Sequence, residues 1–309
     1  MLKTRIFKGA RWFALGSLVL LDGCSLSNSP LLDPAGPIGR SEMHLIVIAF
    51  LLMLIPVIPV IVMTFWFARR YRASNTNATY KPNWAHSNKI ELVVWMIPIL
   101  IVVGLSVLSW ITTHKLNPYK RLVVKQNGVA VKSLPIDVIA LNWKWLFIYP
   151  EQHLATVNQM VIPVGTPLNI HLTSDTVMTS FFIPRLGTQI YAMAGMMTRL
   201  NLLASRAGTF TGLNTQISGV GFSKMHFKVI AMKPQGFATW VAKVHRSPKQ
   251  LDFAAYRKLE KPSLVNPVTY YSDVSPNTLF SDVIAKYTQG RKLTSAQEQL
   301  ALRSFRSSH

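Results

Sequence analysis

Cysteine is almost absent from this sequence, which has one, Cys24, in 309 residues. A disulfide framework, a four-cysteine zinc site and a dicysteine copper or iron–sulfur centre each need more thiols than this chain supplies. The sequence therefore excludes such centres from being built by this chain alone.

Acidic residues are also scarce, since 12 Asp and Glu stand against 33 Lys and Arg, for a net charge of +21. On a soluble chain such an excess would suggest binding to nucleic acid. Half of the residues are hydrophobic, however, only 15% are charged, and the mean hydropathy is +0.26. These values are too apolar for an average soluble protein and too polar for a bundle of many membrane helices. The composition predicts a membrane part joined to a soluble part.

The N-terminus has the pattern of a secretory signal. Residues 1–11 carry cations and no acid, and residues 12–21 are almost wholly apolar, which is the order of the basic and hydrophobic regions of a signal peptide. The Leu-Asp-Gly-Cys stretch that ends at Cys24 resembles the lipobox of bacterial lipoproteins, in which cleavage before the cysteine is followed by its acylation. We predict a lipoprotein signal peptide at residues 1–23 and lipidation of Cys24. The alternative is an idle cysteine after an ordinary signal or anchor helix.

Two long apolar runs predict transmembrane helices at residues 44–68 and 90–111, because about 20 apolar residues cross a hydrocarbon core roughly 30 Å thick. The loop between them, residues 69–89, holds cations and no acid. The positive-inside rule places this loop in the cytoplasm, and residues 24–43 and the chain after the second span in the periplasm. Residues 112–309 hold 23 Lys and Arg against 8 Asp and Glu, so we expect no nucleic-acid partner. This charge either contacts anionic headgroups or forms a solvated surface.

After the second span, the arrangement of apolar residues along the chain first predicts β-strands and then helices. Residues 112–233 read as short β-strands, in runs such as 134–149 and 160–173 that are rich in Val, Ile, Phe and Tyr. Residues 234–309 read as short amphipathic helices, the last of them at 296–305. The predicted fold class is a two-helix transmembrane hairpin, followed by a periplasmic β-sandwich with short C-terminal helices.

Several motifs make this architecture specific. They are YRASN at 71–75, PNWAHSNK at 82–89, WKW at 143–145, FFIPRLG at 181–187 and QIYAMAGM at 189–196. Together with the architecture, they resemble subunit II of haem-copper terminal oxidases, and within that family the branch of cytochrome bo type ubiquinol oxidases. The resemblance implies a cupredoxin-like fold for residues 112–233.

The resemblance also implies a function. The chain is expected to be a non-catalytic subunit of a proton-pumping complex in the bacterial inner membrane, which oxidises ubiquinol and reduces oxygen to water in the aerobic respiratory chain. Haem and copper are expected in the partner subunit I and not in this chain. The expected partners are subunit I, other small membrane subunits and membrane lipid, but not cytochrome c. An alternative from another class is a free-standing inner-membrane lipoprotein with a cupredoxin-like binding module.

The other branch of the family, the cytochrome c oxidases, carries a binuclear copper centre, and its ligand pattern can be laid on this sequence. The ligand positions fall on Thr179, Asn214, Gln216, Ser218, Phe222 and Met225. Only Met225 keeps a suitable donor, because the coupled coppers need two bridging thiolates. The resemblance therefore implies a cupredoxin-like shell without metal. His171, His226 and Met225 carry donors for a mononuclear copper site, but His226 directly follows Met225, so on a strand their side chains point to opposite faces.

Glu91 is the only acid in the second apolar run. The resemblance implies that it marks the entrance of the proton-uptake route that serves subunit I. A structural role is also open, because Asn88 is a favourable helix cap and an acid suits the positive end of the helix dipole.

The resemblance implies that Trp143 and Trp145 lie in an aromatic region that, in the copper-bearing branch, is near the docking and electron-entry surface for cytochrome c. Without a copper acceptor that role has no destination. We therefore expect both side chains to pack in the core and at an interface.

Overall fold

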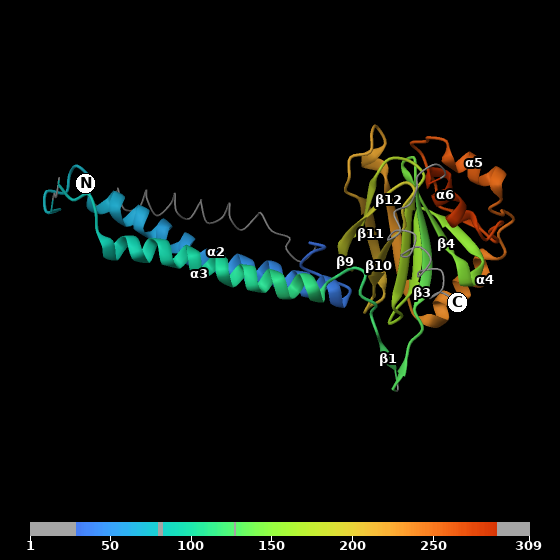
Figure 1. Cartoon of the computed structure of the whole chain (residues 1–309), viewed down its shortest axis with the longest axis horizontal. Coiled ribbons are helices and arrows are strands. Elements are labelled where there is room, and N and C mark those ends of the chain that lie inside the picture. Colours follow the sequence, from blue (N-terminus) through green and yellow to red (C-terminus); the bar gives the residue numbers. More distant parts are fainter. Residues whose placement is uncertain (1–28, 80–82, 127, 289–309) are drawn as a thin grey trace, which may run out of the picture.

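The computed structural model describes residues 29–79, 83–126 and 128–288. A long helical hairpin joins one side of a β-sandwich, and short helices cover the opposite side (Figure 1). The predicted fold class is confirmed. The predicted signal peptide, Cys24 and the predicted helix at 296–305 lie outside the described residues.

The hairpin consists of helices α2 (Pro37–Arg70) and α3 (Asn88–Lys115). Both are long and apolar enough to cross a membrane, and most of their apolar side chains are exposed. Helix α2 starts at Pro37, seven residues before the predicted span. Proline suits the first turn of a helix, because its missing N–H would have no partner within the helix there. The helix then runs through Pro56 and Pro59 as one element.

The sandwich has a six-stranded and a five-stranded sheet. In spatial order the first contains β10 (Thr198–Leu202), β7 (Leu168–Ser174), β3 (Leu134–Leu141), β4 (Lys144–Tyr149), β5 (Leu154–Val157) and β13 (Thr269–Tyr271). The second contains β6 (Gln159–Pro163), β12 (His226–Met232), β11 (Gly208–Asn214), β8 (Thr179–Ile183) and β9 (Gly187–Ala192). A separate ribbon in the linker after α3 pairs β1 (Lys125–Gln126) with β2 (Val129–Ala130).

Some predicted element boundaries are wrong. The run 134–149 is two strands, separated by a tight turn in which Trp143 takes a left-handed conformation with φ 59°. A pattern of apolar residues does not signal such a turn, because bulky side chains rarely adopt a positive φ. The predicted helical extension also contains a strand, since β13 pairs with β5 at the edge of the six-stranded sheet.

Strand β4 lies between two hydrophobic cores. Its side chains alternate, so Trp145, Phe147 and Tyr149 face the other sheet, while Leu146 and Ile148 face the C-terminal helices. Both sets are buried, which is why the strand reads as a continuous apolar run.

Helices α5 (Phe253–Glu260) and α6 (Leu279–Thr288) pack on the outer side of the six-stranded sheet. Helix α4 (Pro234–Val244) instead packs beside β6 and contributes Trp240 and Val244 to the core between the sheets. Trp240 of α4 packs against the ring of Tyr149 with centroids 5.4 Å apart. Helices α5 and α6 close the second core with Tyr256, Leu279 and Val283. The described part of the extension, residues 234–288, therefore belongs to the folded domain.

The segment before and at the start of α2 ties the hairpin to the sandwich. We call residues 29–42 the N-terminal strap. The N–H of Ala35 donates to the carbonyl of Arg185 over 2.6 Å. The carboxylate of Glu42 accepts from both the N–H and the hydroxyl of Thr188, each over 2.9 Å. The strap thus fixes the base of α2 against β9.

Candidate functional site

The positions aligned with copper ligands gather at one end of the five-stranded sheet. Strand β11 ends at Asn214 and pairs there with Phe181, close to Thr179 at the start of β8. The other four positions lie on the loop from β11 to β12: Gln216, Ser218, Phe222 and Met225.

Asn214 is the centre of this end of the sheet, and its buried amide is fully engaged. Its Oδ1 accepts from the N–H groups of Ser180 over 2.9 Å and Gln216 over 3.0 Å. Its Nδ2 donates to Oγ of Ser218 over 3.0 Å and contacts Sδ of Met225 at 3.3 Å. An amide side chain has two donor hydrogens and a carbonyl oxygen with two lone pairs. These contacts use all of them, and we call the set the Asn214 network.

This donor set does not fit a binuclear copper centre. The ligand positions supply hydroxyls, amides, a phenyl ring and a thioether, and the thioether of Met225 is the one soft donor among them. The hydroxyl of Thr179 is buried and has no hydrogen-bond partner among the described residues. In the described part of the chain, no group of three or more His, Cys, Asp or Glu gathers as a possible metal site.

The two histidines weighed as ligands of a mononuclear site lie apart. His171 is on β7 of the six-stranded sheet, with Nδ1 2.8 Å from Oδ1 of Asp137. His226 starts β12 of the other sheet and is exposed, whereas Met225 beside it is buried. The structure therefore does not bring these three donors together.

Both tryptophans pack against this region. Trp145 is fully buried and meets the rings of Phe181 and Phe227 edge-on, at centroid distances of 5.4 and 5.6 Å. Trp143 covers Gly221, where an added Cβ would lie 2.2 Å from its ring. Its Nε1 also donates to the carbonyl of Ser218, over 2.9 Å. Trp143 thus packs on the outer side of the loop from β11 to β12, and the Asn214 network binds the inner side of the same loop.

Comparison with known proteins identifies the family. Residues 123–232 match the model described as cytochrome c oxidase subunit II, periplasmic domain, and residues 245–291 match the COX aromatic rich motif. A cytochrome bo(3) ubiquinol oxidase subunit 2 from Pseudomonas aeruginosa is 51% identical over 287 residues, which cover 93% of this chain and 84% of that protein. The chain belongs to the subunit 2 family of ubiquinol oxidases. The resemblance read from the motifs is confirmed.

Other members of the subunit 2 family and a solved domain match as well. A ubiquinol oxidase subunit 2 from Acetobacter aceti is 50% identical over 281 residues, which cover 91% of this chain and 89% of that protein. The periplasmic domain of subunit II of cytochrome oxidase from Bradyrhizobium japonicum aligns with a TM-score of 0.35 and 21% identity, over 45% of this chain and 99% of that chain.

The loops around the Asn214 network of this subunit 2 chain expose apolar side chains. We call them the apolar rim, and each is more than 40% exposed: Val177, Met178, Met196, Ile217 and Val220. They share one end of the sheet, because the start of β8 pairs with the ends of β9 and β11. Clustered exposed apolar side chains mark an interaction surface.

Glu91 lies in the first turn of α3, at the end of the hairpin far from the sandwich. Its Oε1 is 2.8 Å from Nδ1 of His86, and both side chains are more than half exposed. The predicted capping by Asn88 is wrong, because Asn88 is already helical and Ser87 occupies the cap position without a side-chain hydrogen bond. The carboxylate is therefore held by His86, which sequence pattern did not single out.

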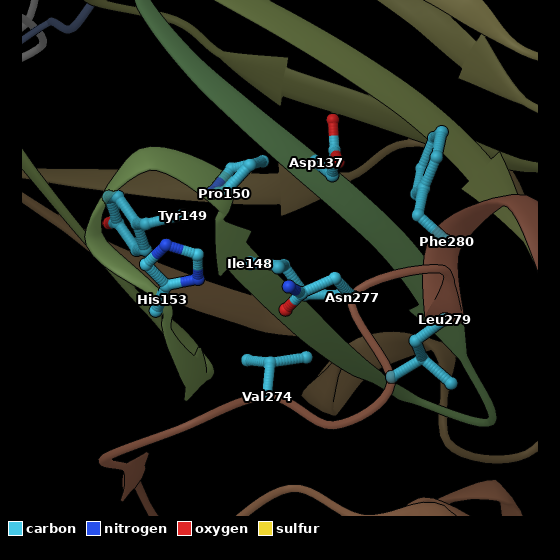
Figure 2. A pocket seen from close by; sticks show the side chains of 9 residues that line it. All are labelled: Asp137, Ile148, Tyr149, Pro150, His153, Val274, Asn277, Leu279 and Phe280. Carbon is cyan, nitrogen blue, oxygen red and sulfur yellow. The ribbon is translucent and has the colours of Figure 1, made fainter.

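A small cavity of about 120 Å³ lies between the six-stranded sheet and the C-terminal extension (Figure 2). Figure 2 shows His153 and Phe280 approaching it from opposite sides, with Asp137 and Asn277 between them. The Asp137 carboxylate is already bonded to His171. Pockets for ordinary ligands run from about 300 to 1,000 Å³, so we assign no substrate to this cavity.

Proposed function

We propose that this chain is a copper-free, non-catalytic subunit II of a proton-pumping ubiquinol oxidase in a bacterial inner membrane. The complex oxidises ubiquinol and reduces oxygen to water. The identity with ubiquinol oxidase subunits over most of the chain supports the substrate. The Asn214 network supports the copper-free part of the proposal, because amide, hydroxyl and thioether groups bonded to one another occupy the positions that copper ligands would need.

In this proposal haem and copper belong to the partner subunit I, and electrons from ubiquinol reach them without crossing this chain. Two exposed apolar surfaces support a contact role, namely the hairpin and the apolar rim. The hairpin packs against membrane helices of subunit I and of other small subunits. The rim packs against the outer face of subunit I. Cytochrome c is not a partner in this proposal, because the chain holds no copper centre that could accept its electrons.

The proposed topology has the loop between α2 and α3 in the cytoplasm and the sandwich in the periplasm. The basic loop and the match to a periplasmic domain support this orientation. Cleavage of residues 1–23 and acylation of Cys24 then tether the mature N-terminus to the outer leaflet, close to the strap. Glu91 lies at the cytoplasmic end of α3 and marks the entrance for protons taken up toward subunit I.

The test is oxygen consumption by the complex purified on a C-terminal tag, with either ubiquinol or reduced cytochrome c as the electron donor. We expect activity with ubiquinol alone, and no copper bound to this chain after its separation from subunit I. Turnover with cytochrome c, or copper on the separated chain, would contradict the proposal. Purification without any haem protein would favour the free-standing lipoprotein instead.

A further inference from the structure

The linker that leaves α3 carries an unusual concentration of positive charge. Residues 115–132 contain five cations and no acid: Lys115, Lys120, Arg121, Lys125 and Lys132. All five side chains are exposed. Lys132 pairs with Glu151 over 2.9 Å, whereas the other four form no ion pair within the described part of the chain. We call the described residues of this stretch, 115–126 and 128–132, the basic ribbon.

Apolar side chains are exposed between these cations. Val123 and Val129 are each 71% exposed and Tyr119 is 54% exposed. Exposed cationic and apolar side chains in one segment are typical of chain that lies in the interface of a membrane, where acyl chains and headgroups meet.

The first part of the basic ribbon, up to Leu122, is held in place by the sandwich. Leu116 and Leu122 pack on the hydrophobic core, and the carbonyl of Pro118 accepts from the side chain of Asn201 over 2.9 Å and from its N–H over 3.1 Å. Lys115, Lys120 and Arg121 therefore project from an anchored backbone and lose little conformational freedom when they bind a ligand.

The ribbon starts at the level of the lipid headgroups. Trp110 is 70% exposed near the end of α3, where an aromatic side chain marks the boundary of the hydrocarbon core. Lys115 follows about 7.5 Å further along the helix axis, which is about the depth of one headgroup layer. Figure 1 shows β1 projecting below the sandwich, on the half nearer the hairpin, while α5 lies on the far side of the sandwich.

We infer that the basic ribbon binds the headgroups of anionic phospholipids at the membrane surface where α3 ends. The charge, the interleaved apolar side chains and the position at the end of the span all match such a surface. Cations are ordinarily depleted in the segments that flank spans on the outer side. The inference uses the proposed membrane insertion of the hairpin but not the proposed substrate of the complex.

The test uses the whole oxidase complex in phosphatidylcholine vesicles that contain a small share of a photoreactive phospholipid. The reactive group is on the headgroup of either phosphatidylglycerol or phosphatidylcholine, and the labelled peptides of this chain are mapped by mass spectrometry. Each cation near an anionic surface strengthens the attraction about fivefold. We therefore expect phosphatidylglycerol to label residues 115–132 at least about fivefold more than phosphatidylcholine does, and high salt to reduce the difference.

Three variants sharpen the test. Lys120→Gln, Arg121→Gln and Lys125→Gln together should bring the labelling down to the phosphatidylcholine level, whereas Lys120→Arg with Lys125→Arg should keep it. The matched control removes the same charge from exposed residues on α5 and just before it, with Lys249→Gln, Arg257→Gln and Lys258→Gln. This control should label like the unchanged protein.

Equal labelling by the two lipids, or labelling that survives the triple Gln variant, would overturn the inference. Loss of another subunit from the triple variant with unchanged lipid labelling would identify an acidic protein surface as the true partner. Ubiquinol oxidation is measured on the same vesicles, so a failed lipid test with intact turnover leaves the proposed function standing.

Discussion

Lys144 is a lysine buried in the interior of the domain, where charged side chains are rare. It is 3% exposed, and burial lowers the pKa of its ammonium group. Its Nζ donates to the carbonyls of Leu259 and Lys261, over 3.0 and 2.8 Å, and to the hydroxyl of Ser263 over 2.9 Å. The side chain of Lys144 on β4 therefore provides hydrogen-bond donors for the carbonyls at the C-terminal end of α5, more than a hundred residues away in the sequence.

Replacing this residue tests the role of its hydrogen bonds. Lys144→Met keeps an unbranched side chain that is one atom shorter and removes the donors, so two carbonyls and a hydroxyl lose their partner. A buried polar group without a partner costs about 1–3 kcal/mol, and we expect the unfolding free energy of the domain to fall by about 2–3 kcal/mol. Thermal unfolding of the complex checks this. Lys258→Met, an exposed control on α5, should change stability by less than about 0.5 kcal/mol.

Glu91 can be tested at the same scale. If protons enter beside it, Glu91→Gln should slow ubiquinol oxidation and proton uptake several-fold while haem content stays unchanged. A carboxylate that only stabilises the helix end would instead affect assembly. Glu151→Gln in the sandwich is the matched control. Unchanged turnover and proton uptake in the Glu91 variant would contradict a role of this carboxylate in proton entry.

At the scale of elements, a polar clasp holds α6 to the sandwich. The fully buried carboxylate of Asp175, just after β7, accepts from the hydroxyl of Tyr256 over 2.6 Å and from Nζ of Lys286 over 2.8 Å. Lys286 also pairs with Glu260 over 2.8 Å. Burial alone would raise the pKa of Asp175, but the hydrogen bonds from Lys286 and Tyr256 outweigh it and hold the pKa below its usual range.

This shift predicts how the clasp responds to acid. Because the folded pKa is lowered, the stabilisation is complete above the ordinary aspartate value of about 3.9 and is lost as the pH falls through the folded pKa. Asp175→Asn should lower the thermal midpoint near neutral pH and reduce its fall under acid. Midpoints measured from neutral pH downward check this, with the exposed Asp282→Asn as control. An identical acid profile for the Asp175 variant would show that other groups control the response.

At the scale of the whole molecule, the N-terminal strap sets how the hairpin meets the sandwich. Asp33 pairs with both Arg185 and Arg206, and these arginines, Arg206 most strongly, lower the pKa of its carboxyl group. Gly36 has no room for a side chain, since an added Cβ would lie 2.3 Å from the carbonyl oxygen of Leu203. The segment just after the predicted lipid anchor is thus folded onto the domain.

Weakening the strap should loosen this junction without unfolding the sandwich. Asp33→Asn keeps the size of the side chain but removes its charge, and we expect the amides of Ala35 and Gly39, which donate to Arg185 and Leu186, to exchange hydrogen several-fold faster. Hydrogen exchange followed by mass spectrometry on the complex measures this. Amides of β4 serve as the internal reference. Equal protection in the variant and the unchanged protein would contradict the role of this ion pair.

The sequence by itself determined the features that depend on composition and local period. Spans 44–68 and 90–111 follow from the thickness of the hydrocarbon core, and helices α2 and α3 contain them. The sequence also predicted that the ligand positions cannot hold a binuclear copper centre. A hydroxyl at position 179 or an amide at position 214 is not a copper ligand of the required kind, whatever its position in the fold.

Only the tertiary structure decided how distant residues meet. The Asn214 network, the contact of Lys144 with the end of α5, the Asp175 clasp and the pairing of β13 with β5 each join residues on different elements. A local pattern reports which face of an element is buried, but not which partner buries it. The left-handed turn at Trp143 has the same origin, since the packing of its ring over Gly221 outweighs the local preference of a bulky residue.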